Sequence, residues 1–170
     1  TLALISALCI SGDSAAELPV FEQALQNVNS TVMVQESFKL GQLTLPGQQF
    51  VYVEAVSLSS PFYQFQRLGA LYVWTIAENE KRGEYVDLDE FPKLRSGLEY
   101  IGSKSIELSG KILDHTSMTY RTRGGLSIGF WQDGKLQKGV IVLDGVQLQF
   151  EAITEFIPEF VALLDKADAV

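Results

Sequence analysis

The side chains best suited to hold a ligand lie in one short segment and in a tryptophan that follows it. Residues 120–125 read Tyr-Arg-Thr-Arg-Gly-Gly, so two cations and an aromatic ring precede a flexible pair of glycines. Such a set can hold a phosphate group or stack against a base. The competing interpretation is ordinary strand alternation, in which Tyr120 faces the core and both arginines face solvent. The candidate ligand-binding residues are Tyr120, Arg121, Arg123 and Trp131.

Two aromatic pairs suggest a second kind of surface. Tyr72 lies two positions before Trp74, and Phe130 directly precedes Trp131. Rings of this kind can form an exposed platform for a sugar, a peptide or a base. Adjacent residues of a strand point to opposite faces, so one ring of the pair at 130–131 should be buried. Core packing therefore competes with the platform interpretation.

His115 is the only histidine, and it stands between a carboxylate and two hydroxyls in the row Asp114-His115-Thr116-Ser117. Nucleophilic catalysis needs a base that touches the nucleophile and a third group that orients the base. Neighbours on a strand point in different directions, so this row does not by itself form a triad. We expect a histidine in a turn or at a strand end, and no catalytic residue.

Carboxylates gather before the first long helical pattern. Asp87, Asp89 and Glu90 could coordinate a hard cation such as calcium through oxygen. No EF-hand spacing is present, and Asp89 fits the N-cap of a helix with Glu90 in its first turn. One cysteine and one histidine cannot assemble a Cys/His zinc site. The sequence also lacks phosphate-loop, dinucleotide-loop, G-x-S-x-G and HExxH motifs, so we expect no metal and no cofactor.

The composition is that of a folded, acidic protein. Of 170 residues, 46% are hydrophobic and 20% are charged, which is enough apolar material for one buried core. The formal net charge is −8, and this balance argues against a nucleic-acid partner because phosphate binding depends on cationic side chains. The single Cys9 excludes an intramolecular disulfide.

The start of the sequence has the character of an export signal. Residues 1–10 are apolar and uncharged, and Ser14-x-Ala16 provides a small-residue cleavage site before Glu17. This pattern predicts a signal-peptide remnant over residues 1–16 and a periplasmic or extracellular location. If residues 1–16 form a buried N-terminal segment instead, the location would be cytoplasmic. A lipid anchor on Cys9 is a minor alternative. The stretch is too short to span a bilayer.

Two stretches that lie 62 positions apart share one pattern of apolar residues. Residues 83–88 and 145–150 alternate as strands do, and each runs into a segment with helical spacing. This double use predicts one structural unit used twice, with pseudo-repeats at about 31–103 and 104–167 in a single domain over 17–170. The matched pairs are Val86 with Leu148, Leu88 with Phe150, Phe91 with Ile153, Leu94 with Phe156, Leu98 with Phe160, and Ile101 with Leu163.

The remaining patterns fill in this scheme. A short helix is expected over Leu18–Val28, and Gly69 is expected to mark a bulge or bend. Asp133-Gly134 and Asp144-Gly145 are the strongest hairpin turns, and Gly102 stands where a helix-ending glycine belongs. The expected strands are Thr31–Phe38, Phe50–Leu58, Phe62–Ile76, Gly83–Leu88, Ser105–Leu113, Ser117–Arg123, Leu126–Gln132, Val140–Leu143 and Val146–Phe150.

Two antiparallel meanders, each followed by an amphipathic helix, define an α+β fold with pseudo-twofold symmetry. This order resembles the Whirly proteins and the simpler single-stranded-DNA-binding domain of the PC4 type, over about Thr31 to Lys166. It is also similar to small uncharacterised bacterial proteins of the same pattern. The resemblance rests on element order, and this sequence has no lysine-rich motif of the Whirly kind.

The sequence therefore favours an exported, non-enzymatic domain that binds an unknown protein or small ligand. Self-association into a homo-oligomer is a reasonable addition, because an open sheet edge often pairs. The alternative is a single-stranded nucleic-acid-binding protein that uses Arg121, Arg123 and aromatic rings. A second alternative is a hydrolase that uses His115.

Overall fold

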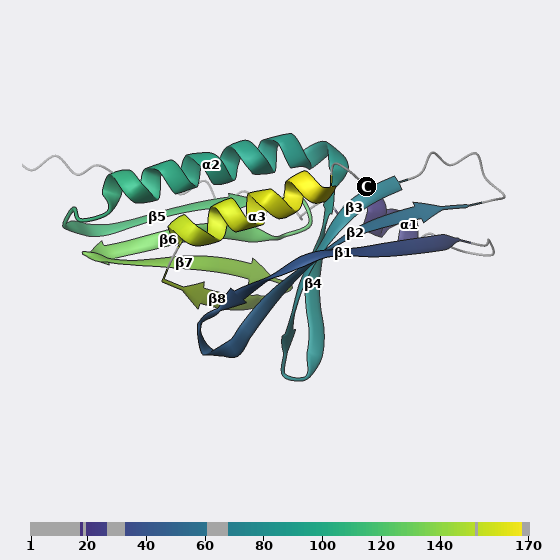
Figure 1. The fold of residues 1–170 in the computed structure, drawn as a ribbon, viewed down its shortest axis with the longest axis horizontal. Helices are drawn as coiled ribbons and strands as arrows, with labels where there is room; N and C mark the ends of the chain where they lie inside the picture. Colours follow the sequence, from purple (N-terminus) through teal and green to yellow (C-terminus); the bar gives the residue numbers. More distant parts are fainter. Residues whose placement is uncertain (1–17, 19, 27–32, 61–67, 152, 168–170) are drawn as a thin grey trace, which may run out of the picture.

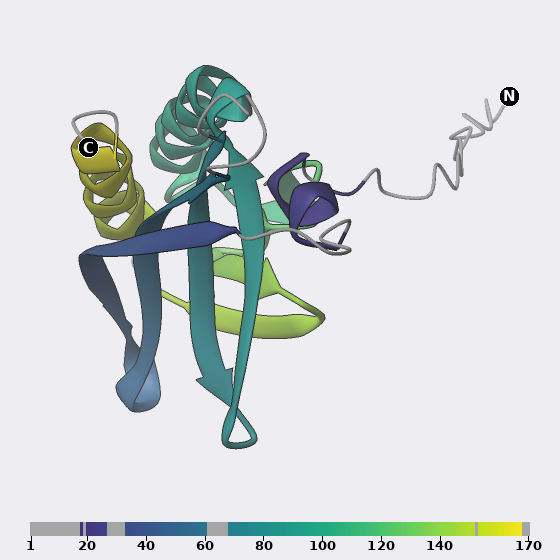
Figure 2. The same ribbon diagram turned by 90° about the vertical axis from the view of Figure 1, so that its right-hand side faces the viewer.

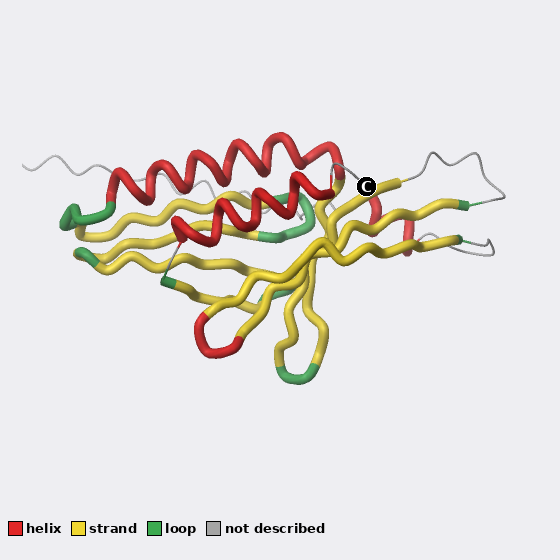
Figure 3. The backbone as a smooth tube through the Cα atoms, viewed as in Figure 1, coloured by secondary structure: helices red, strands yellow, loops and turns green. Residues whose placement is uncertain are grey.

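The computed structural model describes residues 18, 20–26, 33–60, 68–151 and 153–167, and the predicted signal remnant over residues 1–16 lies outside them. Figure 1 and Figure 3 trace the chain through three helices and eight strands in this described part. The elements are α1 (Val20–Gln26), β1 (Val34–Leu45), β2 (Gln49–Ser59), β3 (Leu68–Ala77), β4 (Glu80–Asp87), α2 (Phe91–Leu108), β5 (Leu113–Arg121), β6 (Ser127–Gly134), β7 (Leu136–Leu143), β8 (Val146–Phe150) and α3 (Ile153–Ala167), with 3-10 turns at Pro46–Gln48 and Leu88–Glu90.

The strands form two four-stranded antiparallel sheets whose order follows the chain, β1-β2-β3-β4 in sheet A and β5-β6-β7-β8 in sheet B. This confirms the predicted α+β fold of two meanders, each followed by a helix. The turn between β7 and β8 has positive φ at both Asp144 (45°) and Gly145 (76°), as a two-residue hairpin requires. Glu78 and Asn79 adopt the same conformation between β3 and β4, with φ values of 53° and 65°.

The repeated pattern marks equivalent places in the two units. Helix α2 begins at Phe91 and α3 begins 62 positions later at Ile153, and the matched apolar residues of both helices are buried. One pair differs: Leu88 is 49% exposed, whereas Phe150 is 3% exposed. The cause is local, because β4 ends at Asp87 and a 3-10 turn takes Leu88 out of the strand, whereas β8 continues through Phe150.

Helix α2 is longer than the sequence pattern predicts. It passes through Gly102 and ends at Leu108, so the strand expected over Ser105–Leu113 is wrong and β5 begins only at Leu113. The boundary between the two units therefore falls after Leu108. Gly102 is instead a contact point between helices, since a Cβ there would lie 3.6 Å from the Ile157 side chain of α3. The residue with positive φ after the helix is Gly110, at 81°.

Two further local predictions are wrong. Asp89 is not the N-cap of α2, because the helix begins after Glu90 and neither side chain caps it. Gly69 does not mark a bulge, since β2 and β3 pair across it in regular register. A Cβ on Gly69 would lie 2.6 Å from the terminal methyl of Leu88, an exposed side chain that packs over this glycine. The shift in register occurs between Lys39 and Gly41 of β1.

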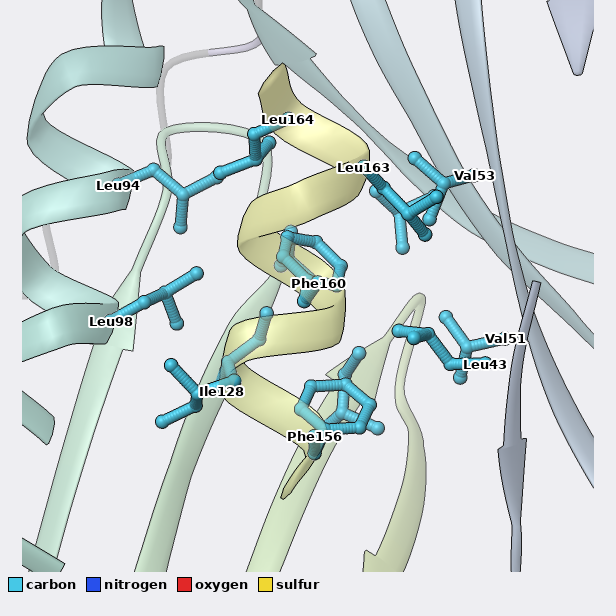
Figure 4. Packing of buried hydrophobic residues seen from close by; sticks show 14 of the residues in the cluster. Leu43, Val51, Val53, Leu94, Leu98, Ile128, Phe156, Phe160, Leu163 and Leu164 are labelled. Carbon is cyan, nitrogen blue, oxygen red and sulfur yellow. The ribbon is translucent and has the colours of Figure 1, made fainter. Parts of the chain in front are cut away.

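A single apolar core joins the two units. Helices α2 and α3 cover sheet B, and α3 also packs on β1 and β2 of sheet A. In Figure 4 the labelled side chains of α3 lie between the leucines of α2 on one side and those of sheet A on the other. Phe160 sits in the middle of this arrangement and has no exposed surface. Among the described helices, none combines the length and the apolar character that crossing a membrane demands.

Sheet A has a second, smaller apolar cluster on its other face. Helix α1 lies on the side of the sheet away from α3, as Figure 2 shows, and it places Phe21 against this cluster. The backbone N–H groups of Val20 and Phe21 donate to the Asp87 carboxylate at 2.8 and 3.1 Å. Asp87 therefore holds the first turn of α1 from a position that is distant in the sequence.

Candidate functional site

The four residues that the sequence singles out do not meet in one place. Tyr120 faces the helices, where its ring lies against Gly97 of α2 and the main core. Arg121 is exposed on the other face of β5, and Trp131 is half-buried on that outer face of sheet B, where it pairs with Ser117 and Lys138. Only Arg121 and Trp131 therefore share a face that a ligand could reach.

Arg123 is engaged by carboxylates of the first unit. Its guanidinium pairs with Asp89, lies 3.3 Å from Asp87 Oδ2, and lies 3.4 Å from Glu90 Oε2. Its backbone N–H also donates to Glu90 Oε1 at 2.9 Å. Asp87 and Glu90 are only 5% and 8% exposed, so the arginine neutralises buried negative charge. These acidic residues, considered above as calcium ligands, face a guanidinium instead.

The histidine motif and the candidate metal ligands do not assemble into a site among the described residues either. His115 is exposed in the irregular start of β5, where the register shifts between Leu113 and Thr116. It forms no hydrogen bond with a hydroxyl or carboxylate of the described residues. No group of three potential metal-ligating side chains is found within the described ranges.

The most distinctive surface lies on the outer face of sheet A, where aromatic side chains form a row. Strand alternation brings them to one side, and register brings them together, because Tyr52 pairs with Trp74 and Tyr72 pairs with Tyr85. The neighbouring ring centroids are 4.2 Å apart for Tyr52–Trp74 and 4.6 Å for Tyr72–Tyr85. Phe50 extends the row beyond Tyr52 at 6.1 Å, and the buried Phe21 of α1 closes its other end against Tyr85 at 5.0 Å, with only 1% of its surface exposed. We call these six rings the aromatic row: Phe21, Phe50, Tyr52, Tyr72, Trp74 and Tyr85.

A carboxylate is embedded in this row. Glu54 is 9% exposed and accepts hydrogen bonds from Trp74 Nε1 at 3.0 Å and from Ser37 Oγ at 2.7 Å. The Lys81 ammonium lies over the rings of Tyr72 and Trp74, at 4.6 and 4.0 Å from their centroids, and 4.0 Å from Glu54 Oε1. We call Tyr72, Trp74 and Glu54 the Lys81 cage, because they surround the ammonium.

The electrostatics of this face favour positive charge. Burial raises the pKa of Tyr72 to about 12, and the nearby Tyr85, Glu54, Asp144 and Glu84 add to the rise. Burial also raises the pKa of Tyr85, with Glu22 and Glu54 contributing. Both pKa shifts indicate that this face disfavours negative charge, because the tyrosines are partly buried and carboxylates already lie nearby.

The opposite face of β4 carries a different polar contact. Glu84 Oε1 accepts the backbone N–H of Asp144 at 3.0 Å and so joins sheet A to the β7–β8 turn of sheet B. Burial raises the pKa of the Glu84 carboxyl to about 7, while the hydrogen bond from Asp144 opposes the rise and the Asp144 carboxylate adds to it. The junction between the two sheets is therefore sensitive to pH near neutrality.

Replacing Glu84 with glutamine is expected to stabilise the protein increasingly as pH rises from about 4.5 to 7, with the full gain above pH 7. The pKa in the folded chain exceeds the ordinary 4.5, so the stabilisation from Glu84 is complete below pH 4.5 and is lost as pH rises through 7. Glutamine keeps the acceptor without ionising. Urea unfolding should give equal free energies near pH 4.5 and a gain of about 1 kcal/mol for the variant at pH 8, after allowance for solvent screening at this half-buried site.

The matched control is Glu99→Gln, at an exposed position of α2. Its free energy of unfolding should follow that of the unmodified chain at every pH. Parallel curves for Glu84→Gln and the unmodified chain would show that Glu84 does not gain its proton at the sheet junction.

Comparison of the chain with protein-family models, with curated proteins and with solved structures finds no match in any of the three.

The sequence contains part of the signal for the aromatic row. Tyr72 and Trp74 share the outer face of sheet A, which agrees with the predicted aromatic platform. Phe130 is only 2% exposed and packs in the core instead. The sequence reasoning missed Tyr52 and Glu54. Their alternation with Val51 and Val53 marks them as one face of a strand, but nothing in it identifies Trp74 as the neighbour across the ladder.

Proposed function

We propose that this chain is a non-enzymatic binding domain and that the aromatic row of sheet A is its ligand-binding surface. One observation carries the proposal: stacked, half-buried rings and the buried carboxylate of Glu54 lie together on one face of the sheet. Rings supply large contact area at low conformational cost, and a fixed carboxylate supplies direction. Such a face suits a small organic ligand that stacks on Tyr52 and Trp74.

The test is a ligand-observed NMR screen of small organic compounds that include glycosides, aromatic acids and quaternary ammonium salts. Compounds that bind should lose affinity by about tenfold in Tyr52→Leu, because the ring stacked on Trp74 is removed. The matched control is Trp131→Leu, which removes a half-buried ring from the outer face of sheet B. Binding that survives Tyr52→Leu but fails in Trp131→Leu would refute the proposal.

A single-stranded nucleic-acid binder of the PC4/Whirly kind is the second candidate. Its support is the shared outer face of Arg121 and Trp131 on sheet B. Three carboxylates hold Arg123, so of the two arginines that the sequence offered for phosphate binding only Arg121 is left for this role. Oligonucleotide binding that weakens steeply with salt and with Arg121→Ala would favour this candidate.

Export remains part of the proposal and rests on the apolar start of the sequence. Mass spectrometry of the native protein should find an N-terminus near Glu17. A hydrolase based on His115 would be supported only by an activity that His115→Ala abolishes.

A further inference from the structure

Lys81 occupies a site with the features of a cation receptor. Its ammonium lies within 5 Å of two ring centroids and beside a carboxylate that is nine-tenths buried. Ring faces carry negative potential, and a cation within about 6 Å of a ring centroid is attracted to it. Two rings and one carboxylate on a single cation form the arrangement by which proteins recognise organic ammonium groups.

The way Lys81 sits in the cage indicates that it can leave. Both oxygens of Glu54 already accept hydrogen bonds, one from Trp74 and one from Ser37, and the ammonium stands 4.0 Å from the nearer oxygen. Among the described residues, none accepts a hydrogen bond from this ammonium. The Lys81 side chain is 46% exposed, so it can swing into water on its flexible stem while β4 stays in place.

A quaternary ammonium group would lose less hydration free energy than the lysine ammonium does on entering the same cage. The lysine ammonium is compact, strongly hydrated and has three donors, whose bonds to water are not replaced by the rings. A quaternary ammonium has no N–H group to satisfy, and its methyl groups can pack on Tyr72 and Trp74. Either cation would balance the charge of Glu54.

We propose that the Lys81 cage is a binding site for a quaternary ammonium group and that Lys81 is the internal cation it displaces. This inference rests on the proposed function of the aromatic row and names the chemical class of its ligand. Lys81 then sets the affinity of the site, because every ligand must replace a cation that the chain itself supplies at high effective concentration.

Tetramethylammonium chloride is the probe, and Trp74 fluorescence in a Trp131→Phe background is the readout. Removal of the internal cation in Lys81→Met should tighten binding by about tenfold. Adding Glu54→Gln or Tyr72→Leu to Lys81→Met should cancel that gain. Either double variant is enough for the test, so the test still works if one of the two fails to fold. Sodium chloride at the same ionic strength should leave the fluorescence unchanged.

The matched control is Lys104→Met on α2, where the ammonium lies 5.8 Å from the single ring of Tyr100 and has no buried carboxylate beside it. This variant should bind the probe as the unmodified chain does. Equal affinity of Lys81→Met and the unmodified chain, or an equal response to sodium, would overturn the inference. If screened compounds still bind through Tyr52 in that case, the proposed function stands and only the ligand class is wrong.

Two further arms distinguish the source of the ammonium group. Choline tests a small molecule, and a peptide with trimethyllysine tests a modified protein. Either ligand should compete with tetramethylammonium for Lys81→Met, and the one that binds more tightly identifies the source. Failure of both to compete would contradict the assignment of the cage.

Discussion

Replacing Phe160 with alanine is expected to lower the free energy of unfolding by about 3–5 kcal/mol. The ring has no exposed surface and lies where α3 meets α2 and both sheets. Its removal leaves a cavity that the surrounding helices and strands cannot close without losing other contacts. Urea denaturation followed by tryptophan fluorescence measures the change.

The equivalent position in the first unit, Leu98, should respond in the same way. Leu98→Ala is expected to cost about 2–5 kcal/mol, since this side chain also has no exposed surface. Trp74 reports on sheet A and Trp131 on sheet B, so each can be followed alone after the other is replaced with phenylalanine. One core predicts coincident transitions from both reporters in both variants.

Ile106→Ala is the control for these substitutions. It removes an aliphatic side chain from α2 at a position that is 64% exposed, so the free energy of unfolding should change by less than about 0.5 kcal/mol. Two separate transitions, with Phe160→Ala shifting only the one reported by Trp131, would mean that the two units fold independently.

Replacing Arg123 with alanine is expected to destabilise the protein by about 2–4 kcal/mol. The change leaves the buried carboxylates of Asp87 and Glu90 without their cation. The loss should fall below that of a fully enclosed ion pair, because the guanidinium is 35% exposed. Thermal and urea unfolding at neutral pH provide the measurement.

Arg121→Ala is the natural comparison, two positions away on the exposed face of β5. Its expected effect on the free energy of unfolding is within about 0.5 kcal/mol. Equal destabilisation by the two substitutions would contradict a neutralising role for Arg123. The same pair informs the nucleic-acid alternative, since the carboxylates of Asp87, Asp89 and Glu90 hold Arg123 and not Arg121.

Local chemistry explains why much of the fold could be predicted from the sequence. The alternation that contains Val86 in one unit and Leu148 in the other, and the helical spacing that follows each, are set by residues close together in the chain. Asp144-Gly145 likewise defines its turn with two residues. The prediction failed at Gly102, where α2 continues to Leu108 and buries Ser105 one turn later, because tertiary packing of the helix outweighs the local tendency of glycine to end it.

The candidate site depends on contacts that no local pattern contains. Tyr52 meets Trp74 through the register of two long strands, and no two-residue turn fixes that register. Arg123 reaches Asp87 and Glu90 across the boundary between the two units. Cations and rings were recognisable as residue types, but which of them face a ligand is decided by tertiary structure.

The order of sheet A places β1 at its rim, next to β2 alone among the described strands. Its first six residues, Val34 to Lys39, are all exposed, and the irregularity after Lys39 interrupts the ladder. A second copy of the chain could therefore add its own strand along only about 20 Å before the main-chain groups fall out of step. Growth by repeated strand addition would be restrained by that interruption and by the lysine beside it, whereas a short two-copy pairing would not.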